Sequence, residues 1–515
     1  MTSQVASKSI LPQCQLRERI LSSLGGLGET CVSNLSEWRT TRTADEFAAM
    51  ERDIHALCRA TADEVTNAIL TDIVTDEEFQ RRTNEAVRAS GRRYRSGGRR
   101  RVTITLLGGS KVEVQVSYLR PDKSKRPGRK RGSGRRGKGG AGLYPALAAL
   151  GIWFGVTPAL ANEVCKQVTA SDSVRAGRAA LAGQNIDLGH KQTLRLVEHV
   201  SHRMLEQRRN WLTQALVAPP ATGPLTGKRV VVAIDGGRLR ERRSSGRGRR
   251  RASTGHRKFQ TPWREPKMFV IYVVDDEGKL DSSIRPVYDG TLGDCNVMFE
   301  LLSGYLQQLG TAGAHSLAVV GDGAPWIWDR VDTLVSDLGI DATKVCQVID
   351  WSHAVSTLHT IAGYATSLSE QQRHAWIRTA KDLLHAGKTD QLLARIDALA
   401  TGRRARSIRP HRRYFKDNAA RMHYAAFAAN GTPTGSGAVE SAIRCVINLR
   451  LKGCGKFWKE LNAEGMILMR SYLKAERFDD LFAWSLAQAA PWWHHNTPYA
   501  NSPVVAQPST QPPAT

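Results

Sequence analysis

The sequence predicts a multidomain protein of the α+β class, in which a mostly helical N-terminal half precedes a domain of alternating strands and helices. Helical spacing of apolar residues dominates from residue 43 to residue 217, and a glycine-containing hairpin interrupts it. From residue 228 onward, runs of β-branched residues alternate with helical segments, which is typical of an α/β domain. A chain of 515 residues is long enough to bury several such cores.

The composition is strongly basic. Lys and Arg number 74 against 48 Asp and Glu, which gives a formal net charge of +26. A field of this sign attracts polyanions, so nucleic acid bound through its phosphates is the expected partner. A membrane is the competing partner, but no apolar run approaches the ~18–20 residues of a spanning helix, and no signal peptide is visible. We therefore expect a cytoplasmic, nucleoid-associated protein that does not bind a membrane.

The chain has eight cysteines, and none of them forms a Cys-x-x-Cys pair. This spacing supports neither a zinc ribbon nor a thioredoxin-like site. In a reducing compartment such cysteines are most simply small buried hydrophobic residues.

Residues 1–90 are predicted to be a helical region, although the first ~35 residues lack strong periodicity. Thr43 with Glu46, and Thr75 with Glu78, have the spacing of a capping box. Each pair predicts the start of a helix. A role in DNA binding or dimerisation fits this region.

Residues 91–140 are predicted to form a basic β-hairpin followed by a disordered linker, with 17 Lys and Arg against 2 acids. Segments 102–107 and 112–118 alternate like strands, and Gly108–Ser110 between them is turn-forming. Gly132, Gly137 and Lys138 partly match a phosphate-binding loop, but neither a following Ser or Thr nor a leading strand is present. No nucleotide cofactor is expected.

Residues 141–218 are predicted to be helical and to contain a possible helix-turn-helix. Two helices, Ser171–Leu181 and His190–Met204, are joined by a short polar segment. In a DNA-reading arrangement, the second helix would present residues near its start, namely Lys191, Gln192, Thr193 and Arg195. An ordinary helical hairpin has the same appearance in sequence. Prolines at 219–224 then predict a linker.

Residues 225–352 are predicted to be the first part of an RNase H-like domain, because three neighbouring strands precede alternating helices and strands. The expected strands are 228–235, 267–274, 282–288, 316–322 and 344–350, and the expected helices are about 294–309 and 326–338. A helical insertion at 353–430, the last helices of the domain at 431–485, and a disordered tail at 486–515 complete the prediction.

Three acids occupy chemically suggestive positions. Asp235 and Asp322 each end a predicted strand, and Glu440 lies in the helix opened by Gly435–Gly437. Ligands of open α/β sheets gather at the carboxyl ends of strands, and carboxylates are the ligands preferred by Mg²⁺ or Mn²⁺. Two such ions can drive phosphodiester transfer. Alternatively, each Asp is a turn or cap residue, and Glu440 pairs with Arg444 on a solvated helix.

Five segments in order resemble bacterial insertion-sequence transposases of the ISKra group, within the DDE superfamily. They are Ala233–Arg238 (AIDGGR), Gly321–Trp328 (GDGAPWIW), Asp350–His353 (DWSH), Gly431–Glu440 (GTPTGSGAVE) and Arg450–Trp458 (RLKGCGKFW). The likeness covers roughly residues 229–482, with a weaker match from about residue 92. It implies an RNase H-like catalytic domain with a helical insertion before the last acid. It also implies that Asp235, Asp322 and Glu440 bind the metal ions that cut and join DNA strands.

The resemblance extends to a histidine. Asp350 and His353 resemble the Asp-x-x-His element of Mutator-like transposases, which gives His353 a supporting role near the scissile phosphate. A hydrogen-bonded histidine at a strand–helix junction is the alternative. Many members of the family carry paired cysteines after the N-terminal hairpin, whereas residues 118–123 here have none, so no structural zinc is expected.

Two further groups of residues are candidates for DNA contact. The loop 238–258 holds 10 Lys and Arg with a single Glu, so Arg238 and Arg249 can grip phosphates beside Asp235; a solvated loop is the alternative. Four residues after Glu440 can hold the DNA backbone or stack a base, namely Arg444, Lys452, Lys456 and Trp458. A basic surface helix and loop is their alternative.

The expected function is therefore a DNA transposase that cleaves element ends and transfers the strands into target DNA. It is expected to act on double-stranded DNA as a homo-oligomer, since two element ends must be brought together. The alternatives are a catalytically silent DNA-binding derivative of a transposase, and an RNase H-like structure-specific nuclease.

Overall fold

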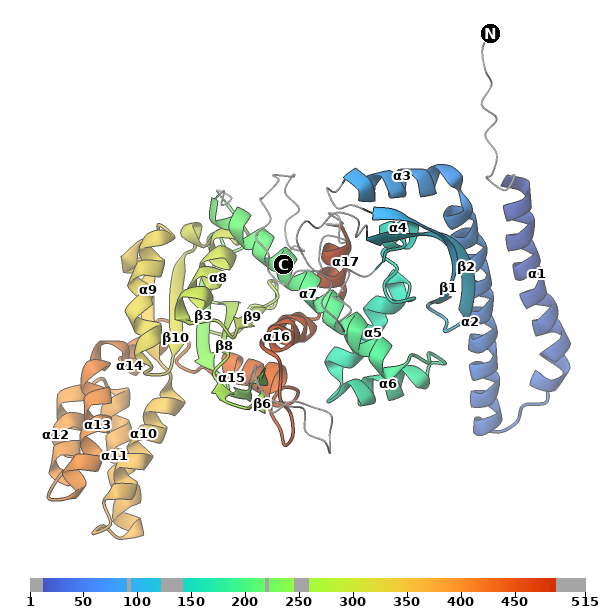
Figure 1. Ribbon diagram of the computed structural model, residues 1–515. Coiled ribbons are helices and arrows are strands. Elements are labelled where there is room, and N and C mark those ends of the chain that lie inside the picture. Colours follow the sequence, from blue (N-terminus) through green and yellow to red (C-terminus); the bar gives the residue numbers. More distant parts are fainter. Residues whose placement is uncertain (1–12, 90–93, 122–141, 218–221, 245–258, 488–515) are drawn as a thin grey trace. The chain divides into compact units, whose positions relative to one another are not determined.

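A computed structural model describes residues 13–89, 94–121, 142–217, 222–244 and 259–487. The described residues fall into two compact units, residues 13–200 with 482–487, and residues 201–481 (Figure 1). The boundary lies inside helix α7 (His190–Val217) and not at the predicted proline linker. The predicted basic linker, the disordered tail and Arg249 lie outside the described residues, except for a few residues at the edges of the first two.

The first unit begins with three helices, α1 (Gln13–Trp38), α2 (Ala44–Thr75) and α3 (Glu77–Ala89). The capping box of Thr43 and Glu46 is confirmed at the start of α2. The second predicted box is wrong, because Thr75 is the last residue of α2 and Asp76 caps α3 instead, its Oδ1 accepting the Phe79 N–H at 2.6 Å. Helix α1 forms although its apolar residues lack a regular spacing, and several of its leucines are exposed.

The predicted hairpin is confirmed as an antiparallel pair, β1 (Tyr94–Thr105) and β2 (Lys111–Pro121). Its turn is fastened to α2, because the Asp63 carboxylate accepts the backbone N–H groups of Gly108 and Ser110, each at 2.9 Å. One face of the hairpin joins the core of this unit, which includes Leu70, Val74, Ile104, Leu106, Val114, Val116, Leu147 and Ile152.

Four helices follow in the chain, α4 (Pro145–Ala149), α5 (Pro158–Ala170), α6 (Val174–Ala182) and α7. Helix α6 is capped by Ser173, whose side chain accepts the N–H of Ala176 at 3.0 Å. The prediction of two helices joined by residues 183–189 is confirmed, but α7 runs well beyond Met204.

The second unit contains a five-stranded mixed sheet. Its order is β11 (Val345–Ile349), β10 (Ser316–Gly321), β3 (Arg229–Gly236), β8 (Lys267–Val274) and β9 (Val287–Thr291). Strand β10 is parallel to β3 and β11, whereas β8 is antiparallel to β3 and β9. Four strands lie where they were predicted. The expected strand 282–288 instead begins at Val287, because Pro286 has no N–H to donate to a sheet.

Helices cover both faces of this sheet. On one face, Phe269 of β8 packs against Tyr305 of α8 (Cys295–Gln308), with ring centroids 5.7 Å apart. Tyr288 lies opposite Val270, one residue along β8 from Phe269, so its side chain points to the other face. There Lys474 of α16 (Glu460–Lys474) lies over its ring at 5.0 Å.

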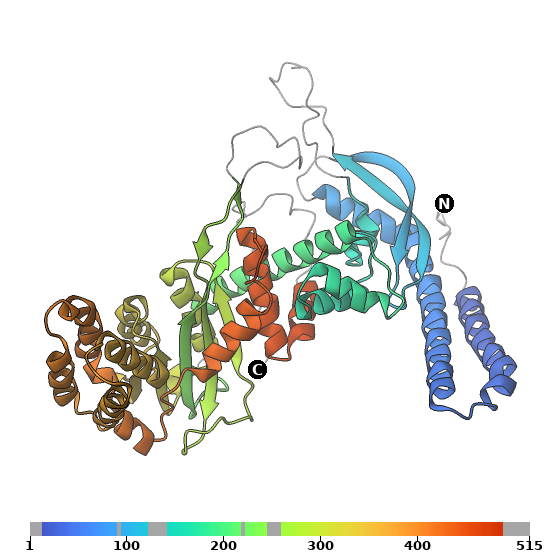
Figure 2. The same cartoon turned by 90° about the horizontal axis from the view of Figure 1, so that it is seen from below.

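The predicted helical insertion is confirmed between β11 and the last part of the unit, and it gathers at one end of the unit (Figure 2). Its helices are α10 (Trp351–Tyr364), α11 (Glu370–His385), α12 (Thr389–Leu399), α13 (Arg404–Asp417) and α14 (Tyr424–Ala429). Helix α9 (Pro325–Asp337) follows β10, and α17 (Phe478–Ala487) is the last described helix.

After the insertion, the chain enters a short helix α15 (Gly437–Ala442) and then a π-helical turn, η4 (Ile443–Asn448). In the π turn the Leu449 N–H bonds to the carbonyl of Arg444, five residues back, at 3.0 Å. The carbonyl of Cys445 instead accepts the Arg470 Nε of α16 at 2.9 Å. This turn thus ties the end of the α15 segment to α16.

The environment of the cysteines differs from the prediction. All eight are free, but only Cys165 is buried. Cys14, Cys58 and Cys454 are exposed, and the other four are intermediate. No described helix has both the length and the apolar character needed to cross a membrane.

Candidate metal centre

Three aspartates come directly after one row of paired residues in the central sheet. Gly321 of β10 lies opposite Ile234 of β3 and opposite Ile349 of β11. The next residues along these three parallel strands are Asp235, Asp322 and Asp350. The predicted convergence of Asp235 and Asp322 at one sheet edge is therefore confirmed in register. Asp350 is a third acid of the same row, which sequence reasoning placed only within an Asp-x-x-His element.

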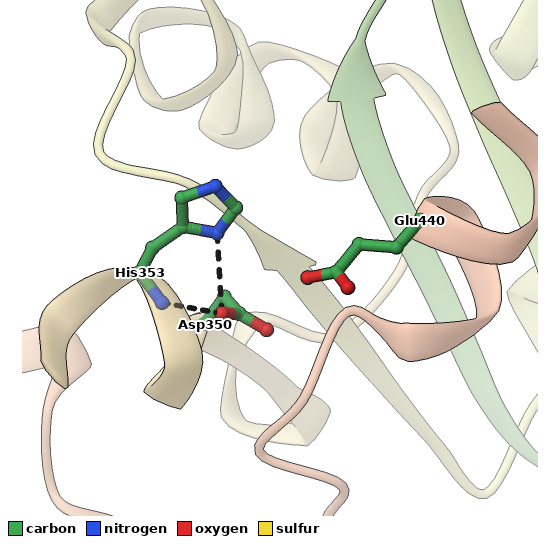
Figure 3. Close-up of side chains that lie close together, drawn as sticks. All are labelled: Asp350, His353 and Glu440. Carbon is green, nitrogen blue, oxygen red and sulfur yellow. Dashed lines mark hydrogen bonds and ion pairs between the residues drawn. The ribbon is translucent and has the colours of Figure 1, made fainter. Parts of the chain in front are cut away.

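Glu440 reaches this edge from α15. Side-chain ligand atoms of Asp350, His353 and Glu440 all lie within 4.8 Å of one another, so these three residues can hold a metal ion. In Figure 3 the three side chains point toward one another from two separate helices and the strand end. Charges at Asp322, His353 and Glu440 also shift the pKa of Asp235, so these residues interact electrostatically. Asp235 and Asp322 themselves are not among the three residues whose ligand atoms all lie within 4.8 Å of one another.

Asp350 is fully buried and accepts several hydrogen bonds. Its Oδ1 accepts the backbone N–H of His353 at 2.7 Å, and its Oδ2 accepts the backbone N–H of Ser436. Burial opposes ionisation of this carboxyl, but the bonds from His353 and Ser436 outweigh burial and lower its pKa to about 2. Asp350 is thus ionised at neutral pH and joins α10 to the segment that precedes Glu440.

His353 carries a positive charge at neutral pH. Its Nδ1 lies 3.2 Å from Oδ1 of Asp350, and this hydrogen bond raises the pKa of His353 to about 9, with further support from the charges of Asp322 and Asp235. A protonated imidazole has no lone pair for a metal, so His353 can join Asp350 and Glu440 as a ligand only after it loses this proton. In its protonated state His353 offsets the negative charge of the neighbouring carboxylates and offers Nε2–H as a donor.

Asp235 and Asp322 each retain coordinating capacity. The Gly236 N–H donates to Oδ1 of Asp235 at 2.6 Å, and the Ala324 N–H donates to Oδ1 of Asp322 at 2.9 Å. Burial, together with the charges of Asp322 and Glu440, raises the pKa of Asp235 to about 6. Crowded carboxylates of this kind are stabilised by a cation.

The carboxylate of Glu440 is held by Ser436, whose Oγ donates to Oε1 at 3.1 Å. Ser436 lies just before α15, and its carbonyl accepts the Glu440 N–H at 3.0 Å. The described residues include no ion pair between Glu440 and Arg444, so the solvated-pair alternative gains no support. Glu440 is exposed, as a residue that meets a substrate must be.

The helical insertion contributes residues that sequence reasoning did not single out. The ring of Tyr414 from α13 packs against the backbone of Gly323, directly after Asp322, and leaves no room there for a side chain. Burial raises the pKa of Tyr414, as do the charges of Asp322 and Asp350. Its hydroxyl is buried, and the described residues include no hydrogen-bond partner for it. No pattern in the sequence indicated that the Tyr414 ring would pack against the Gly-Asp-Gly turn.

The candidate reading residues of α7 divide into two groups. Lys191 and Arg195 are exposed and remain available to a ligand. Thr193 is fully buried, and its hydroxyl donates to the carbonyl of Gly189 at 3.2 Å, so the prediction that it reads DNA is wrong. The Gln192 amide donates to the Phe154 carbonyl at 2.8 Å.

The residues near the metal centre that were predicted to contact DNA also differ in exposure. Arg238, Arg444 and Lys452 are exposed, and Lys456 is partly exposed. Trp458 is used internally: its indole N–H donates to the Leu451 carbonyl at 3.1 Å, and the Arg450 guanidinium lies 5.1 Å from the centre of its ring. These contacts give Trp458 a structural role. It is partly exposed, and its stacking on a base stays a prediction.

We compared the chain with protein-family profiles, with curated proteins and with solved structures, and found no match.

Proposed function

We propose that the protein is a DDE-type DNA transposase whose RNase H-like domain cuts and joins DNA strands with divalent metal ions. The observation that carries this proposal is the row of Asp235, Asp322 and Asp350 at the ends of three parallel strands, with Glu440 brought to the same place by α15. Clustered carboxylates at such an edge are suited to metal-assisted phosphoryl chemistry.

The topology supports this proposal. The sheet order β9-β8-β3-β10-β11, with β8 the single antiparallel strand, is the arrangement expected for an RNase H-like domain. A helical insertion precedes the last acid, as the resemblance to the ISKra group implies. The insertion begins at Trp351, directly after the sheet row, and the chain returns to the site at Ser436.

The donor set fits Mg²⁺ or Mn²⁺. Asp235, Asp322 and Glu440 each engage one carboxylate oxygen in the hydrogen bonds described above, and among the described residues the other oxygen has no such partner. These free hard oxygens match the ligands that the two ions prefer. The resemblance implies two ions, which when bound would activate the attacking oxygen and stabilise the leaving oxygen.

The remaining polar residues of the site have supporting roles. Asp350 is engaged by three donors, so it acts mainly to position His353 and the Ser436 segment. His353 in its charged form would donate from Nε2 to a phosphate oxygen, and its charge would offset the negative charge that collects there.

Double-stranded DNA is the proposed substrate, and a net charge of +26 provides salt-sensitive affinity for it. The available side chains for phosphate contact are exposed or partly exposed cations, namely Lys191, Arg195, Arg238, Arg444, Lys452 and Lys456. Assembly as a homo-oligomer on the element ends in the bacterial nucleoid follows from the same proposal.

The test is strand cleavage and joining by the purified full chain on DNA that carries the element ends. Reactions contain Mg²⁺, Mn²⁺ or a chelator. The key variant is Asp322→Asn, and its matched control is Asp276→Asn, whose side chain is 97% exposed at the opposite end of β3. We expect metal-dependent products from the wild type and the control, and none from Asp322→Asn, with DNA binding retained by all three.

The same experiment separates the alternative functions. Cleavage of branched DNA without joining would indicate a structure-specific nuclease. DNA binding without products in every metal condition, for wild type and variants alike, would indicate a catalytically silent DNA-binding protein and refute the transposase proposal.

A further inference from the structure

A two-stranded arm follows β3 and begins at Leu239, four residues after Asp235. It is built from two antiparallel pairings, β4 (Leu239–Arg240) with β7 (Trp263–Arg264) and β5 (Arg243–Ser244) with β6 (Phe259–Gln260). We call residues 239–244 and 259–264 the β-arm. Along the chain, the arm lies between β3 and β8.

The β-arm pairs aromatic rings with arginines on its surface. The Arg240 guanidinium lies 4.8 Å from the ring centre of Trp263, and the Arg242 guanidinium lies 4.4 Å from that of Phe259. Trp263 is 53% exposed and Phe259 is 37% exposed. Large aromatic rings are costly to leave in water, so this surface has the properties of a binding site.

The charges of the β-arm fall into two groups. Glu241 is buried and accepts hydrogen bonds from Arg243 at 3.0 Å and from Arg264 at 2.8 Å. These two arginines therefore share the single negative charge of Glu241, and Arg264 also pairs with Glu460 at 3.4 Å. Arg240 and Arg242 have no ion pair among the described residues, so their positive charges remain available beside the exposed rings.

The β-arm is also fixed in place relative to the metal centre. The backbone N–H of Trp458 donates to the Arg240 carbonyl at 3.0 Å, and the backbone N–H of Arg242 donates to the Trp458 carbonyl at 2.6 Å. Trp458 belongs to the segment that follows Glu440. The strand of the arm that follows Asp235 is thus hydrogen-bonded to the segment that follows Glu440.

We propose that the β-arm binds unpaired nucleotides of a DNA strand next to the metal centre, with Trp263 and Phe259 stacking on bases and Arg240 and Arg242 contacting phosphates. This inference rests on the proposed function for the identity of the nucleic acid. Cations alone would suffice for duplex DNA, whose base faces are covered by neighbouring base pairs. Exposed rings flanked by free guanidinium groups instead match single-stranded segments, where base faces are open.

The test measures affinity of the full chain in chelator, so that no strand is cut. Three probes are used: a single-stranded oligonucleotide, the blunt duplex of the same sequence, and that duplex with an unpaired 3′ extension. The variants are Trp263→Ala and Arg240→Gln. The control is Leu280→Ala, because Leu280 is 57% exposed and pairs with Val274 at the far end of β8.

We expect Trp263→Ala to weaken binding of the single strand and of the extended duplex by about tenfold, and binding of the blunt duplex by less than about twofold. Arg240→Gln should weaken all three probes and reduce the salt dependence of binding. Leu280→Ala should change none of them. Equal weakening of all probes by Trp263→Ala, or no weakening, would overturn the proposal.

One further measurement and one further variant separate stacking from a loss of fold. Thermal unfolding of each variant checks that the fold is intact, and Trp263→Phe should restore selectivity for unpaired DNA if stacking is the cause. A protein that never cuts DNA but shows the selective loss with Trp263→Ala would refute the transposase proposal and support the β-arm. Metal-dependent cutting without the selective loss would support the transposase proposal and refute the proposed role of the β-arm.

Discussion

The backbone N–H of Ser436 donates a hydrogen bond to Oδ2 of Asp350, a residue 86 positions earlier in the chain. A second bond beside it joins the Trp351 N–H to the Thr434 carbonyl at 2.9 Å. Together these bonds close the helical insertion at its base. Because Ser436 also bonds to Glu440, the position of the last acid depends on the carboxylate of Asp350, which directly follows β11.

Replacing Asp350 by Asn should therefore destabilise the second unit and displace Glu440. The amide keeps one acceptor but directs N–H groups at a donor of Ser436 or His353, and an unsatisfied buried group costs about 1–3 kcal/mol. Urea unfolding in chelator measures the loss, and Mn²⁺ titration measures metal affinity. Asp276→Asn is the control. Unchanged unfolding and metal binding in Asp350→Asn would contradict the role of Asp350.

Gly323→Ala should destabilise the junction between the sheet and the insertion. A methyl group at this position overlaps the Tyr414 ring, and overpacking costs about 1–3 kcal/mol. Gly363→Ala in α10 is the matched control, because nothing lies within 4 Å of its added methyl and alanine favours a helix by up to about 1 kcal/mol. Thermal unfolding should rank Gly363→Ala, wild type and Gly323→Ala in descending order of stability. The opposite order would show that Tyr414 does not fill this space.

Asp289→Ala should strongly destabilise the second unit. Asp289 is fully buried in β9 and accepts hydrogen bonds from Arg208 at 2.8 Å and from Tyr305 at 3.0 Å. Removing one partner of a buried ion pair costs about 3–5 kcal/mol when the other charge is left unpaired. Arg208 keeps its ion pair with Glu464 at 2.7 Å, so we expect the lower end of this range. Tyr305→Phe should cost only about 1 kcal/mol, the value of a single hydrogen bond. Guanidinium unfolding curves of the two variants test this ratio, and similar losses would argue against a buried charge pair.

The stability provided by Glu241 should depend on pH in the acid range. Burial raises the pKa of Glu241, but hydrogen bonds from Arg243 and Arg264 outweigh it and hold the pKa below the usual value of 4.5. A lowered folded-state pKa means that the stabilisation is present above pH 4.5 and is lost as pH falls below it. Thermal unfolding of wild type and Glu241→Gln should differ most at neutral pH and converge in acid. A constant difference across this range would count against the ion pairs.

The sheet could be predicted from sequence because its signals are local. Continuous β-branched runs specify buried strands, and an aspartate directly after such a run marks the strand end. Asp235 and Asp322 followed from this rule. The β9 strand was misplaced by about five residues because alternation in residues 282–288 competes with Pro286, and a proline forbids pairing inside a sheet.

The contacts of the site could not be predicted, because they join segments that are distant in sequence. Nothing in the local pattern indicates that Ser436 meets Asp350 or that Tyr414 meets Gly323. The same limit applies to Thr193, whose burial depends on the packing of the helices in its unit. The expectation of buried cysteines also failed, because apolar character alone does not determine exposure in long helices such as α1 and α2.

The π-helical turn of η4 has a consequence for how the Glu440 segment tolerates change in chain length. In a regular α-helix the Cys445 carbonyl would bond within its own helix, and Arg470 would have to share this acceptor with a backbone N–H. Deleting one residue from 443–448 would restore regular winding and rotate the segment by about 100°. The extra residue thus turns a backbone carbonyl into an anchor for a neighbouring helix, and this segment should not tolerate a single-residue deletion.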